Sequence, residues 1–320
     1  MKLGGKTMPT QATTVIKRPT PHGGVLEALA RNPKLPPSDL AQVQATIGRY
    51  KNWIASLQGS TLSGKERLAA MVEATNQYKK WVDFDLVFQS PSDFLYRQAG
   101  QLKLNSTILE EFLPYLVCEV LVPGIKNIQN ITVGPQSCYA GMFIGPIHAP
   151  IDDGAIFIKT KNQDFTVGRK LFMRACSKGD FASCLDMSFN VAYFVSEIKT
   201  NLDKTMFQEA AATARELKTS VGDAVYVLLC EWLDMPPIDT RVTDIDEVIM
   251  LRKAKRLGSG VRATFSEQSG RKAAAASYEK HLTDNPLSID AFSRLVEKLN
   301  DSFPEQISLS ETEVLKRGYF

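Results

Sequence analysis

The chain has 320 residues, enough for one large domain or two modest ones, and its apolar and charged fractions (44% and 23%) are those of a globular protein. The 38 Lys and Arg nearly balance the 35 Asp and Glu, so a formal charge of +3 does not by itself indicate a polyanionic partner. The sequence contains no apolar leader and no run of 18 uncharged apolar residues, which excludes a visible secretion signal or membrane span and favours the cytoplasm.

The cysteines are odd in number, and no two of them have CxxC spacing. This pattern argues against both a disulfide framework and a zinc site, and it fits a reducing compartment. The five residues are Cys118, Cys138, Cys176, Cys184 and Cys230.

The first third of the chain divides into an irregular segment and a helical one. Residues 1–37 are rich in Pro and Gly, so we predict an N-terminal arm without regular structure. Apolar residues then recur at helical spacing from Leu40, with Ser38 as a possible cap, and again after Gly64. Residues 38–100 are therefore expected to form a helical region.

The middle of the chain changes from helix to strand. A third helix is predicted from about Ser106 to Val120, where apolar residues occupy one face. Beyond it, short apolar or alternating runs are separated by Gly, Pro and Asn, which is typical of several adjacent strands. The predicted strands are 139–147, 155–159, 164–174 and 189–198.

The last third alternates helix and strand. An Ala-rich helix is predicted at 204–219, followed by a buried strand at 224–233 and another at 246–252. The resulting β-β-α-β-β order predicts an α/β fold, a mixed sheet core flanked by helices. Two C-terminal helices are expected near 288–301 and 310–317.

The segment from Gly59 to Lys65 matches the GxxxxGK pattern of a phosphate-binding loop. The next residue is Glu66 where that motif needs Ser or Thr for Mg²⁺, and a helix precedes it where the motif needs a strand. We therefore interpret the segment as a polar turn between two helices.

The stretch Ser196-Glu197-Ile198-Lys199, preceded by Asp164, carries the strongest chemical signal. On a strand, Glu197 and Lys199 point to one face and Ile198 to the other. Two carboxylates can bind a hard divalent cation, and a neighbouring lysine can orient or deprotonate an attacking water. This is the arrangement that a nuclease centre needs.

Taken alone, an ExK triplet is weak evidence, because many proteins of this length contain one at a solvated strand edge. The partner acid is also open on spacing alone, since Asp180 and Asp186 lie nearer to Glu197 than Asp164 does. Both of these residues fall in a stretch that resembles a loop.

Matches dispersed along nearly the whole chain resemble the BbvCI-like restriction endonucleases, a family of the PD-(D/E)XK nucleases. A member of that family has Cys where this chain has Ile198, a difference that is immaterial if the side chain faces the core. The matching residues are Pro21-His22-Gly23-Gly24, Ile108 to Phe112, Tyr115-Leu116, Asp164-Phe165, Gly168, Glu197, Lys199, Met206, Glu209, Ala211, Thr213, Ala214, Glu216 to Lys218, Ile245-Asp246-Glu247, Leu251-Arg252 and Arg317-Gly318.

The resemblance implies a restriction-endonuclease-like fold and a Mg²⁺-dependent type II enzyme that hydrolyses double-stranded DNA at a specific sequence, leaving 5′-phosphate ends. It selects Asp164 as the acid, because Asp180 and Asp186 fall in a variable segment. Asp164 and Glu197 would hold Mg²⁺, and Lys199 would position or activate the water. Family members work as two related subunits, so a heterodimer is implied, although a homodimer is equally open.

In this interpretation the N-terminal arm and the helical region 38–100 embrace the DNA. Residues 101–320 form the nuclease core, including a basic loop at 252–272 and the C-terminal helices.

Two glutamates on the third helix can be separated by helix geometry. Relative to the apolar face around Leu109, Phe112 and Leu116, Glu110 lies about 100° round and Glu111 about 200° round. Glu110 is therefore the expected assistant of the metal centre, and Glu111 is expected to face away. Glu111, and Glu209 on the helix after Lys199, remain possible supports, and all of these glutamates can also be read as ordinary surface acids.

The segment from Arg252 to Lys272 has seven basic residues against the single acid Glu267. Such a run is usually a solvated face, but in a nuclease it is a plausible flexible loop that contacts phosphates. His22, next to two glycines, either lets the backbone approach DNA or packs on its own subunit. The DNA-binding candidates are His22, Arg252, Lys253, Lys255, Arg256 and Arg262.

Two other functions stay open from the sequence. One is a catalytically silent DNA-binding or assembly subunit, and the other is a non-specific PD-(D/E)XK repair nuclease. Neither the base sequence that is recognised nor the number of metal ions can be read from periodicity.

Overall fold

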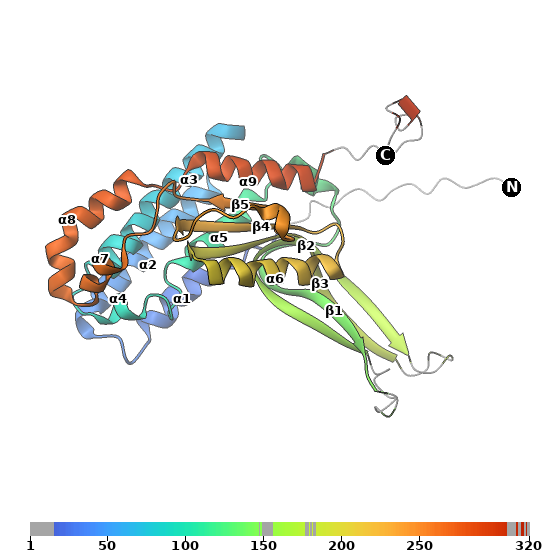
Figure 1. The fold of residues 1–320 in the computed structure, drawn as a ribbon, viewed down its shortest axis with the longest axis horizontal. Coiled ribbons are helices and arrows are strands. Elements are labelled where there is room, and N and C mark those ends of the chain that lie inside the picture. The colour runs from blue at the N-terminus through green and yellow to red at the C-terminus, as the bar shows by residue number, and fades with distance from the viewer. Residues whose placement is uncertain are drawn as a thin grey trace.

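The computed structural model describes residues 16–146, 156–176 and 184–305, with a few isolated positions outside these ranges. Within them, a five-stranded sheet lies between helices (Figure 1). The strands are β1 (Ile131–Ile144), β2 (Ile156–Cys176), β3 (Cys184–Leu202), β4 (Val225–Leu233) and β5 (Glu247–Met250). The helices are α1 (Pro21–Ala30), α2 (Pro37–Gln58), α3 (Gly64–Lys80), the π-helical η1 (Trp81–Phe88), α4 (Phe94–Gln98), α5 (Ser106–Leu116), α6 (Lys204–Ser220), α7 (Ser259–Ala263), α8 (Gln268–Asp284) and α9 (Ile289–Ser302), with short 3-10 turns at Pro123–Asn127, Thr240–Val242 and Thr264–Ser266.

The sheet has the strand order β1-β2-β3-β4-β5. The first three strands pair antiparallel, whereas β3, β4 and β5 pair parallel, with α6 as the crossover between β3 and β4. A parallel pair needs such a crossover because its strands must start at the same end. The structure thus confirms the predicted α/β fold with a mixed sheet and flanking helices.

Helix α6 covers one face of the sheet. Its Phe207 and Ala214 share a buried cluster with Val195 of β3 and Leu228 of β4. The period of the helix and the alternation of the strands bring these apolar residues together.

The opposite face of the sheet is covered by α5 and α9, with the N-terminal helices packed beyond them (Figure 1). Phe112 of α5, Phe165 of β2 and Phe194 of β3 belong to one buried cluster that also reaches α1, α2, α3 and α9. The helical region therefore shares its core with the rest of the chain.

Strand β2 is bent where its register shifts between Val167 and Gly168. A Cβ at Gly168 would meet the backbone of Val191, so only glycine permits this close approach of β2 to β3. The bend divides the antiparallel part into two ribbons. In the first ribbon, residues 136–144 pair with 156–163, and in the second, residues 169–176 pair with 184–191.

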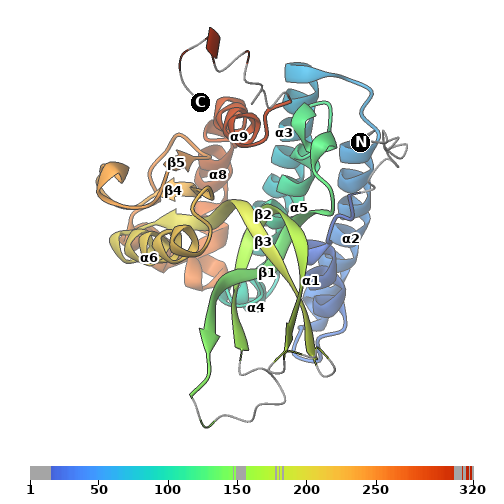
Figure 2. The same cartoon turned by 90° about the vertical axis from the view of Figure 1, so that its right-hand side faces the viewer.

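Both ribbons project from the same side of the molecule (Figure 2). At their base β1 and β3 meet in a parallel bridge between Cys138 and Asn190. The separate strands predicted at 155–159 and 164–174 are therefore wrong, since one strand runs through both. Polar residues between Lys159 and Gln163 break the apolar pattern, but most of them lie on a ribbon that is solvent-exposed and so tolerates them.

The N-terminal segment also differs from its prediction. Pro21–Ala30 forms α1. Proline is tolerated in the first turn of a helix, because a backbone N–H at that position would have no acceptor within the helix. Helix α2 begins at Pro37, so Ser38 is not its cap, and α5 ends at Leu116 instead of Val120. Residues 1–15, and most of the helix expected at 310–317, lie outside the described residues.

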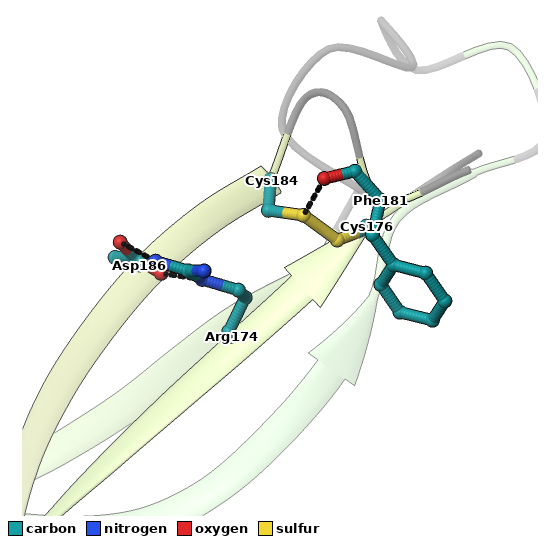
Figure 3. The surroundings of a disulfide bond; sticks show 5 residues. All are labelled: Arg174, Cys176, Phe181, Cys184 and Asp186. Atoms are coloured by element: carbon teal, nitrogen blue, oxygen red, sulfur yellow. Dashed lines mark hydrogen bonds and ion pairs between the residues drawn. A yellow bond between two sulfur atoms is a disulfide. The ribbon is translucent and has the colours of Figure 1, made fainter. Parts of the chain in front are cut away.

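Cys176 and Cys184 form a disulfide at the end of the second ribbon (Figure 3). This corrects the expectation that the cysteines form none. The two cysteines are eight residues apart and face each other because the register of β2 and β3 pairs them, and this register cannot be read from the cysteine spacing. Cys118, Cys138 and Cys230 are free thiols.

Among the described residues, no helix has the length and apolar character needed to cross a bilayer.

Candidate active site

Asp164 and Glu197 come together on the neighbouring strands β2 and β3. Phe165 pairs with Ser196, which places the two acids one step beyond that pair. The backbone N–H of Ile198 donates to Asp164 Oδ2 at 2.9 Å. Asp164 is thereby held against the ExK segment, although the whole second ribbon lies between Asp164 and Glu197 in sequence.

The side chains around Glu197 alternate as expected for a strand. Ile198 is 6% exposed and lies in the large core cluster, whereas Lys199 Nζ contacts Glu197 Oε1 at 2.6 Å. The side chains of Glu197 and Lys199 remain partly accessible, at 16% and 23%. The predicted separation of acid and base from the intervening apolar residue is confirmed.

Tyr226 of β4 is a site residue that sequence reasoning missed. Its side chain is fully buried, and its hydroxyl donates to Glu197 Oε2. Burial, followed by the charge of Glu197, raises the pKa of Tyr226, so the hydroxyl stays protonated as a donor. A tyrosine inside an otherwise apolar strand was the available signal, because a buried hydroxyl needs a partner.

The acids of this site disfavour one another's charge. Burial raises the pKa of Asp164, and the charge of Glu197 adds to this, against the lowering effect of the Ile198 N–H. Burial also raises the pKa of Glu110, and the charge of Asp164 is the next cause. The exposed Lys103 partly offsets both shifts.

Lys199 is stabilised as an ammonium. Burial alone would lower its pKa, but the hydrogen bond and charge of Glu197, with the charges of Asp164 and Glu209, raise it overall. Glu209 is an exposed residue of α6, so it acts on Lys199 through its charge. In this state Lys199 neutralises Glu197.

The two glutamates of α5 have different surroundings. Glu110 is 6% exposed, and the charge of Asp164 helps to raise its pKa, so the two carboxyl groups lie near enough to interact. Glu111 is fully buried and accepts hydrogen bonds from the backbone N–H groups of His22 and Gly23 and from the Tyr50 hydroxyl. The expectation that Glu111 faces away is therefore wrong. Helices α1 and α2 cover that side of α5, and Glu111 ties the three helices together.

His22 lies in the interior. It is 0% exposed, and its ring nitrogens contact the hydroxyls of Thr107 and Tyr78 at 3.0 and 2.7 Å. Burial and the charge of Lys79 lower the pKa of His22 to about 3, so the ring is neutral. This overturns its placement at the DNA surface and favours the other interpretation, packing within its own subunit.

The basic stretch is not a flexible loop. It contains α7 and the start of α8, and Arg252 and Arg271 are 3% and 1% exposed. Arg252 pairs with Asp83 and Glu231. The phosphate-contact role expected for Arg252 is therefore wrong, because its guanidinium is used inside the molecule. Arg271 likewise donates to backbone carbonyls, including that of Phe88.

The other basic candidates lie nearer the surface. Lys253 pairs with Asp290 and Arg256 with Asp234, while Lys255 is exposed. Arg262 donates to the carbonyl of Leu257.

Asp186 does not belong to this site. It lies on β3 in the second ribbon and pairs with Arg174 in an exposed contact (Figure 3). It is eleven residues from Glu197 on the same strand. At a rise of about 3.3 Å per residue, this separation corresponds to a distance on the order of 35 Å along the strand. The stretch was expected to be a loop, but β3 already begins at Cys184. Asp180 lies outside the described residues.

The turn at Gly59–Lys65 joins α2 to α3, so the interpretation as a helix-to-helix connection is confirmed.

The donor set fits a hard cation. Asp164, Glu197 and Glu110 supply carboxylate oxygens, the ligands that Mg²⁺ prefers, and their repulsion would be relieved by positive charge. In the described part of the chain, no group of three His, Cys, Asp or Glu side chains is already arranged to hold a metal. Glu197 is instead held by Lys199 and Tyr226.

The mixed sheet, together with a site that combines two acids and a lysine, defines a protein of the restriction endonuclease class. A chain from a solved structure described as "native BbvCI A2B2 tetramer at low resolution" has the same fold, with a TM-score of 0.57 and 17% identity over 87% of this chain and 94% of that chain. Residues 101–320 match the model of the Bpu10I restriction endonuclease family. The chain belongs to this family, and the resemblance seen in the sequence is confirmed. No curated protein sequence matches the chain.

Proposed function

We propose that this chain is a catalytic subunit of a type II restriction endonuclease that hydrolyses double-stranded DNA at a specific sequence in the cytoplasm, leaving 5′-phosphate and 3′-hydroxyl ends. The observation that carries the proposal is the convergence of Asp164, Glu197 and Lys199 from two strands, with Glu110 beside them. Membership of a restriction endonuclease family supports the same reaction class.

Asp164 and Glu197 would hold Mg²⁺, with Glu110 supporting a bound water or a second cation. When bound, Mg²⁺ lowers the pKa of water and offsets the charge that develops on phosphate. Lys199 has two tasks in this proposal. Its ammonium neutralises Glu197 in the free protein, and with substrate it donates hydrogen bonds that orient the attacking water or the phosphate oxygens.

Tyr226 would keep Glu197 in one orientation throughout. Its hydroxyl is buried and donates to the carboxylate, so the acid cannot rotate freely.

We further propose that the working enzyme contains two subunits, either this chain with a related one or two copies of it. One centre cuts one strand, so a double-strand break needs two centres. The structural relative is described as an A2B2 tetramer, which supports assembly with a related partner.

The test is to digest a plasmid with the purified protein, alone and as the co-purified assembly, in Mg²⁺ and in EDTA, and to sequence the cut ends. The proposal expects Mg²⁺-dependent cuts at one recurring sequence with 5′-phosphates. Cuts at random positions would identify a non-specific nuclease instead. Cleavage that survives Glu197→Gln in a homogeneous preparation would show that the assigned residues do not perform the chemistry.

A further inference from the structure

The second ribbon has one polar and basic face. Cross-strand partners share a face of a ribbon, and the pairs on this one are Lys170 with Asn190, Phe172 with Ser188, and Arg174 with Asp186. Lys170, Phe172 and Arg174 are all exposed, and Phe172 is 73% accessible. Lys170 Nζ lies 5.5 Å from the centre of the Phe172 ring. We call the stripe formed by Lys170, Phe172 and Arg174 the basic face.

The other face of the second ribbon is mostly apolar and half-buried, apart from the exposed Arg169 at its base. It carries Leu171 paired with Phe189 and Met173 paired with Met187. The Phe189 ring lies 5.3 Å from that of Tyr139 on β1, so near their base the two ribbons contact each other through apolar residues. The apolar face thus has a partner within the chain, whereas Lys170, Phe172 and Arg174 of the basic face are exposed.

The alternation of cation, aromatic ring and cation suits a nucleic-acid backbone. Lysine and arginine attract phosphates without regard to sequence, and an aromatic side chain between them adds apolar contact with sugars or bases. The acid on this face, Asp186, is bound to Arg174 in a pair that is open to water (Figure 3). Exposed pairs contribute only about 0–1 kcal/mol, so a phosphate can readily replace Asp186.

The basic face is continuous with the candidate active site, because both lie on β2. From Gly168 at the bend to Arg174 the strand advances by six residues, about 20 Å at about 3.3 Å per residue. That length corresponds to roughly six base-pair steps of about 3.4 Å.

We propose that the basic face of the second ribbon binds the phosphate backbone of duplex DNA to one side of the bond that is cut. This inference rests on the proposed nuclease function and adds a contact surface to it. Lys170 and Arg174 bind phosphates, and Phe172 lies between them against the sugar edge. The contact sets the position of the duplex and does not read bases.

The decisive variant is Lys170→Ala with Arg174→Ala, measured by anisotropy of a fluorescent 40-base-pair duplex of random sequence over a range of salt concentrations. Two lost contacts should lower the log–log salt slope by about 1.8 and weaken binding by about tenfold or more near 0.1 M salt. Lys126→Ala with Lys280→Ala is the matched control. It also removes two exposed cations, each paired with one acid, but neither of them lies on the second ribbon, and it should change neither quantity.

A second variant, Phe172→Ala, separates the roles of charge and ring. It should weaken binding without changing the salt slope, because no charge is lost. An unchanged affinity and slope in the Lys170 and Arg174 variant, with wild-type protein that still cuts plasmid, would overturn the surface and leave the proposed function standing. Wild-type protein that neither binds nor cuts would overturn both. An altered oligomeric state with unaltered DNA binding would assign the face to a protein partner and also overturn the inference.

Discussion

Two charge clusters in the molecule have opposite characters. The closed cluster consists of Lys79, Asp83, Glu231 and Arg252, in which two acids balance two bases and no side chain is more than 6% exposed. The open cluster consists of Asp164, Glu197, Glu110 and Lys199, in which three acids face one base and water reaches Glu197 and Lys199.

The contacts explain why only the open cluster is suited to chemistry. In the closed cluster Arg252 binds both acids at 3.3 and 3.1 Å, and Lys79 lies 3.2 Å from Asp83 and 3.1 Å from Glu231. The contact between Lys79 and Glu231 Oε1 is electrostatic without hydrogen-bond alignment. The closed cluster is balanced in charge, whereas the open cluster has an excess of negative charge that a cation would neutralise.

The largest effect is expected when an acid of the open cluster is replaced, in the variant Glu197→Gln. We expect loss of cleavage by more than about 100-fold, since loss of an outer partner of a metal ligand alone typically costs about 10–100-fold. Binding of the duplex should survive, because the amide keeps the shape. Mixed with an intact partner subunit, the variant should nick one strand, as a plasmid gel will show.

Asp164→Asn should be equally inactive, and Asp186→Asn is its matched control. Asp186 is exposed and paired with Arg174, so its amide should retain cleavage. If Asp186→Asn proved inactive and Asp164→Asn active, the site would have been assigned to the wrong segment.

For the closed cluster the expected effect is on folding. Arg252→Ala leaves two buried acids with one base, and breaking a buried pair typically costs about 3–5 kcal/mol. Denaturant titration should therefore show a large loss of unfolding free energy. Lys253→Ala removes an exposed cation from the neighbouring position and should cost less than about 0.5 kcal/mol. Equal losses in both variants would remove the distinction between buried and surface cations.

Binding of a cation should stabilise the open cluster only when its acids are intact. At a concentration of 100 times the dissociation constant, Mg²⁺ would add about 2.7 kcal/mol to wild-type stability. For a chain of 320 residues that corresponds to a rise in Tm of roughly 4 °C. Asp164→Asn should show no such rise in a thermal scan. The same Mg²⁺ response in both proteins would place the cation elsewhere.

The pH dependence of Glu110 gives a smaller effect. Burial and Asp164 raise the pKa of Glu110 in the folded chain, so its charged form destabilises the fold above that raised pKa. This cost disappears as pH falls through the raised value towards the ordinary value of about 4.3. Glu110→Gln should therefore raise Tm at pH 8 in EDTA, with a difference that shrinks in acid. A lower Tm for the variant at pH 8 would contradict the sign.

The smallest effect is expected from the surface part of the basic stretch. Replacing Lys253, Lys255 and Arg256 together by Ala should lower the salt slope of DNA binding by at most about 0.9 per lost contact, equally on any sequence. Two of these cations already have acidic partners, which reduces the change. An unchanged slope would leave the segment as solvated surface, and a loss confined to the cognate duplex would assign it to base reading.

The mixed sheet and the ExK face could be predicted because local pattern determines them. Period-two alternation separates Glu197 and Lys199 from Ile198, and the helix at 204–219 marks the crossover that makes β3 and β4 parallel. The choice of Asp164 needed the family resemblance, since spacing left other acids open. Its contact with Ile198 depends on pairing across 34 residues.

What could not be predicted depends on distant partners. The burial of Glu111 depends on α1, which the sequence does not predict, and the ion pair of Arg252 depends on Asp83, which lies 169 residues away. The disulfide follows from the β2–β3 register, which composition does not contain. Tyr226 was overlooked because its role appears only when β4 lies beside β3.

The bend at Gly168 lies between the candidate active site and the second ribbon, and β2 runs through both. Asp164 lies four residues before the bend and the second ribbon extends beyond it, so the acid and the ribbon are joined by one continuous backbone. The bend is fixed by the close approach of Gly168 to the Val191 backbone, where no side chain fits. The direction in which the second ribbon leaves the core is therefore set within the same strand that carries Asp164, four residues away from it.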